Sequence, residues 1–284
     1  MYNLHRVAPT LLCSIRCLSS NPARYVLSER VDSCIQILTL NDEKRANCLS
    51  FTLIGELHNA LLDVQRDQDV RALIIRGAGR FFSAGHDLNE MGEGSTAESR
   101  SKLFQTCTEM MQQLARLPVP SIAAIRGPAF AAGCQLVAAC DLAVAGEMAT
   151  FSTPGVKLGL FCSTPGVPLV RAIGVRAAKE LLLTGRTINA QRAYELGLIH
   201  RLVPDDQVLE SALALAREIT QHSKPVVSMG KQTLDKQAAL ESIDEAYSVA
   251  AQTMLDNLEL EDTKRGIQSF IRKRSMPKWT HKSN

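Results

Sequence analysis

The chain of 284 residues has few aromatic side chains, 5% in total, and no long apolar run. A membrane-spanning helix needs about 18 consecutive apolar residues, so we expect no transmembrane segment. Hydrophobic residues make up 45% of the chain and charged residues 21%, which is an ordinary globular composition. The composition therefore excludes collagen-like, coiled-coil and wholly disordered proteins, and the length suffices for a sizeable hydrophobic core.

The charge balance gives no reason to expect a nucleic-acid partner. The 32 basic and 29 acidic residues leave a net charge of +3. Arg6, Arg16 and Arg24 all precede the first acidic residue, Glu29, so the rest of the chain is neutral overall. A neutral body lacks the basic surface with which proteins hold nucleic acids.

Residues 1–20 differ in composition from the rest of the chain. They contain arginine and serine but no acid, and a helix would place their leucines near Arg6 and Arg16. Such a segment is typical of a mitochondrial transit peptide. A secretory signal fits less well because no uninterrupted apolar core follows the first residues. We therefore predict a mitochondrial matrix protein whose mature form begins between about Cys17 and Val26.

The chain has 8 cysteines but no C-x-x-C pair, and several cysteines lie in apolar surroundings. We expect reduced, buried cysteines that form neither disulfides nor metal sites. No H-E-x-x-H, P-loop or G-x-S-x-G motif occurs. We therefore expect no metal site and no resident cofactor.

Short apolar runs alternate with amphipathic helices over the first two thirds of the chain. The runs that predict strands are Cys34–Leu40, Val70–Arg76, Ser121–Ile125 and Leu142–Ala145. Ser50 is placed to cap a helix with one apolar face. From about Asp205 the pattern predicts helices alone, including Gln207–Thr220 and Leu240–Leu260. The sequence therefore predicts an α/β core over 26–204 and a helical region over 205–284.

Two glycine-containing turns are the strongest candidates for a functional site. Phe81–Asp87 reads FFSAGHD and Arg126–Gln135 reads RGPAFAAGCQ. Each follows a predicted strand, and the second opens a helix. Together they can present two backbone N–H groups toward one point. One of these groups lies at a helix N-terminus, where the dipole favours negative charge.

On these segments the chain resembles the crotonase superfamily, the enoyl-CoA hydratase/isomerase family. The similarity includes FFSAGHDLNEM, PSIAAIRGPAFAAGCQLVAACDLAVA and LTGRTINAQRAYELGLIHRLVP, and it runs from about Val26 to Arg274. It implies a spiral of ββα units whose C-terminal helices build a homotrimer or a dimer of trimers. It also implies an acyl-CoA thioester as substrate or ligand.

The resemblance assigns the oxyanion N–H groups to His86 and Ala132. These would hold the thioester carbonyl oxygen and stabilise an enolate, an effect of about 10²–10³ in rate for one donor. Asn89 stands where hydratases commonly have a phosphate-contacting lysine. The residues that the resemblance implies for CoA contact are Lys44, Arg45, Ala46, Ala84, Phe270 and Lys273.

Both glutamates with which hydratases add water are absent. Their positions are occupied by Gln135, which cannot exchange a proton near neutral pH, and by Gly155, which has no side chain. Each general acid or base contributes about 10²–10⁴-fold, so we expect too little hydratase activity for ordinary β-oxidation. We expect that restoring both glutamates raises the hydration of crotonyl-CoA.

Three functions remain open from the sequence. The first is a mitochondrial acyl-CoA-binding protein of fatty-acid metabolism, hydratase-like by family. The second is a decarboxylase or thioesterase that uses the same oxyanion hole. S-A-G-H-D is similar to the loop of methylmalonyl-CoA decarboxylases, although their tyrosine is replaced by Cys162 here, and the His86 side chain is a candidate acid. The third is a non-catalytic acyl-CoA sensor.

The helices within Gln207–Leu260 carry more apolar residues than one covered face requires. These residues include Leu213, Leu215, Ile219, Leu240, Ile243, Ala246, Val249, Ala250, Met254 and Leu258. An exposed apolar patch of this size is typical of an interface between subunits. Cyclic symmetry would close such a contact in a trimer.

Overall fold

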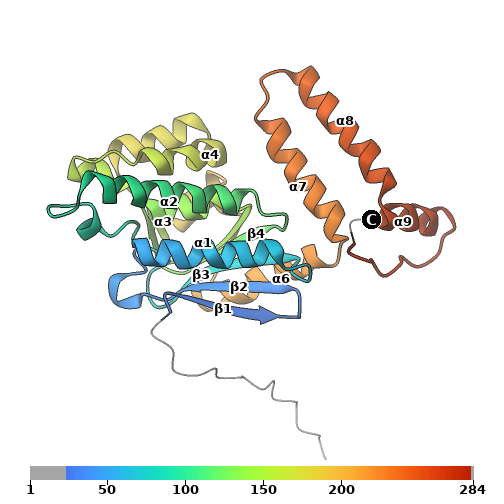
Figure 1. Cartoon of the computed structure of the whole chain (residues 1–284), viewed down its shortest axis with the longest axis horizontal. Helices are drawn as coiled ribbons and strands as arrows, with labels where there is room; N and C mark the ends of the chain where they lie inside the picture. Colours follow the sequence, from blue (N-terminus) through green and yellow to red (C-terminus); the bar gives the residue numbers. More distant parts are fainter. Residues whose placement is uncertain (1–23, 283–284) are drawn as a thin grey trace, which may run out of the picture.

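The computed structural model describes residues 24–282 and shows a mixed α/β core from which several helices extend (Figure 1). The predicted transit peptide at 1–20 lies outside the described residues. The larger sheet has the strand order β1-β2-β3-β4-β6-β9. These strands span Val26–Val31, Ile35–Leu40, Ala72–Gly77, Ser121–Ile125, Leu142–Gly146 and Arg201–Val203. β1 is antiparallel to β2, and the other neighbouring pairs are parallel.

A smaller sheet lies beside the larger one and has the order β5-β7-β8. Its strands span Pro128–Phe130, Thr150–Ser152 and Thr187–Asn189. β5 and β7 are parallel, whereas β7 and β8 are antiparallel. The segment around Ser83 extends this sheet through a parallel bridge to Ala129.

Helices cover both faces of the larger sheet. The helices of the core are α1 (Phe51–Arg66), α2 (Ala97–Ala115), α3 (Ala132–Ala139), α4 (Ser163–Thr184), α5 (Ala190–Glu195) and α6 (Val208–Thr220), of which α4 packs on α3. Short 3₁₀ turns occur at η1 (Glu43–Arg45), η2 (Leu88–Glu90), η3 (Pro154–Leu158) and η4 (Asp205–Gln207). The predicted α/β class with a helical C-terminal region is confirmed.

Helix α1 forms as its sequence predicts, with an N-cap and one apolar face. Ser50 Oγ accepts a hydrogen bond from Leu53 N at 3.3 Å, which satisfies one free N–H group of the first turn. The buried residues of this helix are Leu53, Ile54, Leu57, Leu61 and Val64. They pack in the main apolar cluster with residues of β2, β3 and α2.

Helix α6 packs against the opposite face of the same sheet. Leu213 is 8% exposed, and Leu215 and Ile219 pack with it against Ile35 and Ile74. The expectation that Leu213 belongs to a subunit interface is therefore wrong, because the sheet of the same chain covers it, whereas Leu215 and Ile219 are only partly buried. The division at 204/205 stays a prediction, but α6 itself packs as part of the core.

Beyond α6, three helices extend away from the sheets (Figure 1). They are α7 (Lys224–Ala238), α8 (Ile243–Glu259) and α9 (Glu261–Ile271), and α7 packs against α8. The sequence did not single out α7. A nearly buried lysine anchors it, because Lys231 Nζ lies 2.8 Å from Asp141 Oδ2 and donates to Val119 O at 3.3 Å.

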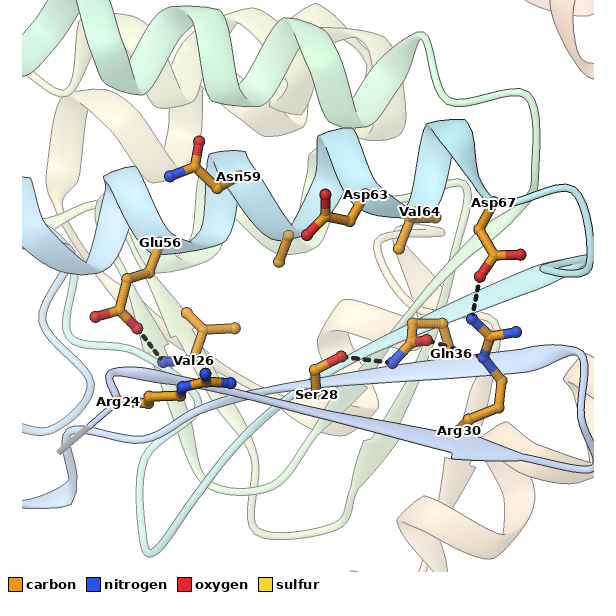
Figure 2. A pocket seen from close by; sticks show the side chains of 11 residues that line it. Arg24, Val26, Ser28, Arg30, Gln36, Glu56, Asn59, Asp63, Val64 and Asp67 are labelled. Atoms are coloured by element: carbon orange, nitrogen blue, oxygen red, sulfur yellow. Dashed lines mark hydrogen bonds and ion pairs between the residues drawn. The ribbon is translucent and has the colours of Figure 1, made fainter. Parts of the chain in front are cut away.

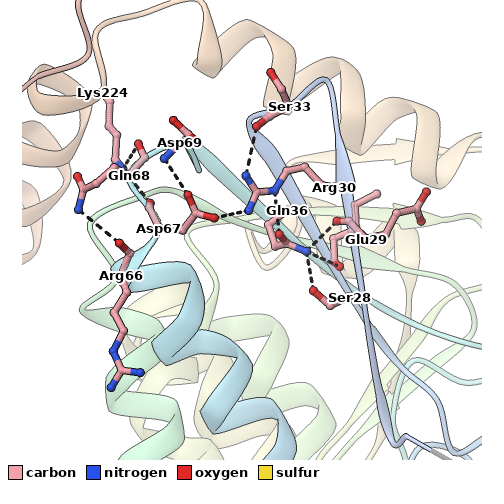
Figure 3. Close-up of polar contacts among 11 residues, drawn as sticks. Ser28, Glu29, Arg30, Ser33, Gln36, Arg66, Asp67, Gln68, Asp69 and Lys224 are labelled. Atoms are coloured by element: carbon pink, nitrogen blue, oxygen red, sulfur yellow. Dashed lines mark hydrogen bonds and ion pairs between the residues drawn. The ribbon is translucent and has the colours of Figure 1, made fainter. Parts of the chain in front are cut away.

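The start of α7 is also tied to the core through the end of α1 (Figure 3). Lys224 Nζ donates to the carbonyl oxygens of Asp67 and Gln68 at 3.2 and 2.8 Å. Arg30 of β1 forms an ion pair with Asp67, with 2.6 Å between Nη2 and Oδ2, and the Arg30 Nε donates to Gln36 Oε1. The junction between core and extension therefore depends on directional polar contacts.

The C-terminal tail returns to this junction. Two donors face the His281 ring: Lys224 N lies 3.3 Å from Nδ1 and Arg71 Nη1 lies 2.8 Å from Nε2, and a neutral imidazole accepts from one of them. The buried Asp262 carboxylate accepts from the backbone N–H of Thr280 and of His281. Burial and the charge of Arg71 lower the pKa of His281 from its ordinary value of 6.5. The neutral imidazole is therefore the form that fits.

We predict that His281 contributes to acid destabilisation. Its pKa is lower in the folded than in the unfolded chain, so its contribution to stability is complete above about pH 6.5 and is lost as the pH falls below that value. Between about pH 7.5 and about pH 5.5, the midpoint of thermal unfolding should fall less in His281→Asn than in the parent protein. His222→Asn, at an exposed position, is the control. An unchanged decrease in His281→Asn would contradict the prediction.

Candidate functional site

The two predicted glycine turns lie at the same edge of the smaller sheet. Ser83 pairs in parallel with Ala129, and Ala129 of β5 pairs in parallel with Phe151 of β7. Neighbouring strands are about 4.8 Å apart, so the carboxyl ends of these three segments lie side by side. Ligands of α/β proteins commonly bind at such an edge. The residues that follow each segment are therefore brought together by the fold.

Two glycines allow the turns to touch. A Cβ at Gly85, where φ is +91°, would lie 2.8 Å from Phe130 O and 3.1 Å from Ala132 N. A Cβ at Gly133 would lie 2.3 Å from Ser83 O. The distances of 2.8 Å to Phe130 O and 2.3 Å to Ser83 O are too short for a real Cβ, so the close approach of the turns requires glycine at each position.

Ala131 begins helix α3 in an unusual backbone conformation. Its φ of 48° and ψ of −117° are sterically unfavourable for a residue with a Cβ, at a cost of about 1–3 kcal/mol. A hydrogen bond of 2.8 Å from Ala131 N to Ser152 O holds the residue in place. The chain thereby turns from β5 directly into the helix, which leaves Ala132 at the first helical position.

The His86 and Ala132 N–H groups are both available to a ligand. Neither donates a hydrogen bond to another atom of residues 24–282. His86 follows Gly85, and a Cβ added at Gly85 would lie 3.1 Å from Ala132 N, so His86 and Ala132 lie close together. Ala132 is at the N-terminus of α3, where free N–H groups and the helix dipole favour negative charge. This arrangement fits the predicted oxyanion hole.

The loop around η1 is fastened to the first glycine turn. Ala84 N donates to Ala46 O at 2.9 Å, and Ser83 Oγ donates to Asn47 O at 2.8 Å. The Asn47 amide donates to the carbonyl oxygens of Ala78 and Phe81. Of the predicted CoA-contact residues, Ala46 and Ala84 are therefore brought next to each other and next to His86.

The two basic residues of this loop differ in their surroundings. Arg45 is held by Asp42 at 2.7 Å and Asp87 at 3.0 Å, and it lies over the Tyr25 ring. The hydrogen bond to Asp42 raises the pKa of Arg45 further. Lys44 is exposed and forms no ion pair with residues 24–282. Lys44 is the freer of the two cations to approach a phosphate.

The His86 side chain is held as a neutral imidazole. Its Nδ1 lies 3.2 Å from Leu49 O, and because a carbonyl only accepts, Nδ1 carries the proton. Burial lowers the pKa of His86, although the bond to Leu49 opposes this. Nε2 is buried without a partner in the described chain, and the ring packs edge-on against Phe104. His86 therefore offers a lone pair here and is a weak candidate for a general acid.

The positions of the missing acids are both buried. Gln135 is 5% exposed, and its Oε1 has no hydrogen-bond partner among the described residues. A Cβ at Gly155 would lie 2.4 Å from Leu160 O and 2.7 Å from Cys162 Sγ. The expectation that Gly155→Glu restores the second acid is therefore corrected, because the backbone of Leu160 occupies the space that a side chain needs.

The nearby cysteines are packed in apolar surroundings. Burial raises the pKa of Cys134 to about 12 and also raises the pKa of Cys162. Such thiols are poor nucleophiles at neutral pH. The six cysteines of the described residues are free, and four of them are buried, namely Cys34, Cys107, Cys134 and Cys162.

The sequence reasoning missed Thr153. This residue precedes η3 at its N-cap, is 0% exposed, and makes no capping hydrogen bond. Its Oγ1 has no partner within the described chain. The signal in the sequence was a threonine directly before the Pro154-Gly155 pair, a position at which a hydroxyl usually caps the following turn.

Phe270 and Lys273 are not brought to the other predicted residues. Phe270 lies near the end of α9 and is 72% exposed, and Lys273 follows that helix. α9 is at the far end of the helical extension, away from α2 and α3 (Figure 1). Within one chain these two side chains therefore do not reach His86.

A cavity of about 570 Å³ lies elsewhere, between β1 and α1 (Figure 2). Its polar groups bond mainly to one another: Gln36 Nε2 donates to Ser28 Oγ, and Glu56 accepts from Val26 N. None of the predicted site residues lines this cavity.

Residues 24–282 contain no helix suited to cross a membrane and no cluster of three or more His, Cys, Asp or Glu placed for a metal ion.

The contact between the turns generates a prediction about stability. Gly133→Ala should lower the free energy of unfolding by about 1–3 kcal/mol or more, because the new methyl group collides with Ser83 O. Gly55→Ala in α1 is the matched control, since its methyl group meets nothing within 4 Å and should raise stability by about 0.5–1 kcal/mol. Urea unfolding of both variants tests this, and equal stabilities would contradict it.

Comparison with known proteins agrees with this architecture. A family model described as enoyl-CoA hydratase/isomerase matches residues 30–282. The human protein named enoyl-CoA hydratase domain-containing protein 3, mitochondrial, is 43% identical over 247 residues, 87% of this chain and 81% of its own. The Danio rerio protein of that name is 40% identical over 264 residues, 93% of this chain and 90% of its own.

Solved structures show the same fold. The crystal structure of human enoyl coenzyme A hydratase domain-containing protein 3 aligns with a TM-score of 0.86 at 41% identity, over 89% of this chain and 100% of that one. An enoyl-CoA hydratase from Mycobacterium smegmatis aligns with a TM-score of 0.86 at 39% identity, over 89% of this chain and 98% of that one. The resemblance seen in the sequence is confirmed, and the chain belongs to the enoyl-CoA hydratase/isomerase family, with its crotonase fold.

Proposed function

We propose that this protein binds an acyl-CoA thioester and holds its carbonyl oxygen between the N–H groups of His86 and Ala132. The observation that supports the proposal is the close approach of Gly85 to the start of α3, where an added Cβ would lie 3.1 Å from Ala132 N, because neither the His86 nor the Ala132 N–H group has a partner among the described residues. Two preorganised donors of this kind stabilise an oxyanion. Family membership supports the same ligand class.

The chain is poorly equipped to hydrate an enoyl-CoA. Gln135 cannot transfer a proton near neutral pH, and Gly155 has no room for a side chain. His86 is held neutral with its acceptor nitrogen unprotonated. We therefore propose that hydratase activity is low and that binding, or a different reaction of the enolate, is the function within fatty-acid metabolism.

The proposed location is the mitochondrial matrix. Relatives at 40% and 43% identity are named as mitochondrial proteins. Residues 1–20 have the composition of a transit peptide. Both observations support a mitochondrial location, and the matrix is our proposal within it.

Oligomerisation is proposed from the helical extension. Apolar side chains on α8 and α9 are exposed in the single chain, among them Tyr247, Met254, Leu255, Ile267 and Phe270. A patch of this kind marks an interface, and we propose a homotrimer or a dimer of trimers. Since Phe270 and Lys273 lie far from His86 within one chain, a role in CoA binding would require the site of a neighbouring copy.

A pair of ligands tests the oxyanion hole directly. Butyryl-CoA and S-butyl-CoA differ chiefly in the carbonyl oxygen, which the thioether lacks. Two hydrogen bonds of about 0.5–1.5 kcal/mol each predict that the thioester binds about fivefold to hundredfold more tightly. Isothermal titration calorimetry measures both affinities. Equal affinities would exclude the oxyanion hole, and no binding of either compound would exclude acyl-CoA as ligand.

Turnover of a ligand panel separates the remaining functions. Release of CO₂ from a malonyl-type thioester would show a decarboxylase, and release of free CoA would show a thioesterase. Binding without turnover would show a non-catalytic sensor. Hydration of crotonyl-CoA at the rate of a hydratase would contradict the proposed loss of the acid pair.

The transit peptide gives a separate prediction. The mature protein should begin between about Cys17 and Val26, because the arginine- and serine-containing segment would be removed on import. Mass spectrometry of the protein recovered from cells measures the terminus. An intact Met1 on most of the protein would contradict the prediction.

A further inference from the structure

The N–H group of His86 belongs to a peptide unit whose other end is held by the chain. A peptide unit is planar and trans, so its C=O and N–H groups point in opposite directions. Gly85 O accepts a hydrogen bond of 2.8 Å from Leu49 N. This bond restrains the peptide unit between Gly85 and His86, and the His86 N–H group therefore points away from Leu49. A bond to the oxygen of an amide also polarises its N–H group, which makes the N–H group a stronger donor.

Leu49 is a firm support for this peptide unit. Its side chain is fully buried in the main apolar cluster, and Ser50, the next residue, is the N-cap of α1. Leu49 forms a parallel bridge with His86, and Leu49 O lies 3.2 Å from His86 Nδ1. One buried residue at the start of α1 thus restrains both the peptide unit and the ring of His86.

The hydroxyl of Ser83 holds the same turn from a second direction. Ser83 is fully buried, and its Oγ donates to Asn47 O at 2.8 Å and accepts from Gly85 N at 3.2 Å. Glycine is the residue whose backbone is freest to rotate, and Gly85 has a φ of +91°. Bonds at both its N–H and its C=O group therefore restrict the residue that would otherwise let the turn move.

Asn47 provides a fixed acceptor for the Ser83 hydroxyl. It is fully buried and has a φ of 52°, a left-handed conformation that asparagine tolerates better than most residues. Its Nδ2 donates to Ala78 O at 2.8 Å and to Phe81 O at 2.7 Å. Its Oδ1 accepts from Asp42 N at 2.8 Å. The Asn47 side chain thereby fastens the loop around η1 to the segment that leads into the first glycine turn.

The two proposed oxyanion donors differ in how they are held. The peptide oxygen paired with the Ala132 N–H group is Ala131 O, which accepts from Gln135 N at 3.0 Å inside α3. A regular helix therefore orients that donor. The His86 donor lies in a loop, so its direction depends on hydrogen bonds to residues far away in the sequence.

Resting on the proposed function, we propose that Ser83 and Asn47 are positioning residues that, with the backbone of Leu49, aim the His86 N–H group at the thioester oxygen. The Ser83 hydroxyl already uses its proton and one lone pair within the chain, so it acts on the ligand through Gly85. A main-chain donor cannot be removed by changing the His86 side chain. Its direction can be changed by removing the bonds that hold the turn.

The first test asks whether Ser83→Ala weakens recognition of the carbonyl oxygen alone. Calorimetry should show that the affinity for butyryl-CoA falls about threefold to tenfold, because one donor is no longer well aligned. The affinity for S-butyl-CoA, which has no carbonyl oxygen, should change less than about twofold. An unchanged ratio of the two affinities in Ser83→Ala would overturn the proposal. Equal affinities in the parent protein would instead overturn the proposed function.

Ser121→Ala is the matched control for a general loss of stability. Ser121 is fully buried at the amino end of β4, and its hydroxyl also makes two hydrogen bonds. They join it to Asp141 Oδ2 at 2.7 Å and to Asp141 N at 3.1 Å. Ser121→Ala should lower the midpoint of urea unfolding about as much as Ser83→Ala but leave the ratio of affinities unchanged. An equal loss of the ratio in Ser121→Ala would attribute the effect to stability and overturn the proposal.

Infrared spectroscopy of bound butyryl-CoA, labelled with ¹³C at the carbonyl, gives a signature that a purely structural role would not change. Hydrogen bonds to the oxygen lower the carbonyl stretching frequency, so the bound ligand should absorb at lower frequency in the parent than in Ser83→Ala. Ser83→Cys keeps a weak donor and acceptor and should retain more of this shift than Ser83→Ala. The full shift in Ser83→Ala would overturn the proposal.

Hydrogen exchange of the parent protein tests the arrangement without any substitution. The N–H groups of Leu49 and Gly85 should exchange slowly in the free protein, because both are hydrogen-bonded and buried. The His86 N–H group has no partner among residues 24–282, so it should exchange faster and become protected when butyryl-CoA binds. Exchange at Leu49 as fast as at His86 would overturn the proposal, even if Ser83→Ala does not fold.

Discussion

The site depends on one steric constraint, the direct contact between two backbone turns. Gly85 lies against Phe130 O and Ala132 N, and Gly133 lies against Ser83 O. A side chain at either glycine would separate the turns and, with them, the two proposed oxyanion donors. The strained backbone of Ala131 and the hydrogen bond from its N–H to Ser152 O also keep the two turns close together. The larger sheet and its helices hold these segments in register.

Much of this arrangement could be predicted from the sequence, because it depends on local signals. Ser50 and the apolar spacing after it predicted α1, and short apolar runs predicted β2, β3 and β4. Both glycine turns were recognised, since a glycine after a strand is a local signal. The family resemblance then predicted that the two turns lie together and form one site.

The remaining features could not be read from the sequence, because they are properties of the assembled fold. Leu213 has the same pattern whether it faces the sheet or a second subunit, and only packing shows that the sheet covers it. The obstruction at Gly155 comes from the carbonyl of Leu160, which depends on how the following turn folds back. Thr153 was overlooked because an unpartnered hydroxyl is defined by absent neighbours, which a sequence does not display.

The return of the C-terminal tail has a consequence for the order of folding. His281 contacts Arg71 and Lys224, and Asp262 receives the backbone of Thr280 and His281. These contacts join residues up to 210 positions apart. Since a chain is synthesised from its N-terminus, the core can form while the tail is still absent. The junction closes only when the last residues emerge, so the angle of the helical extension is among the final features of the molecule to become fixed.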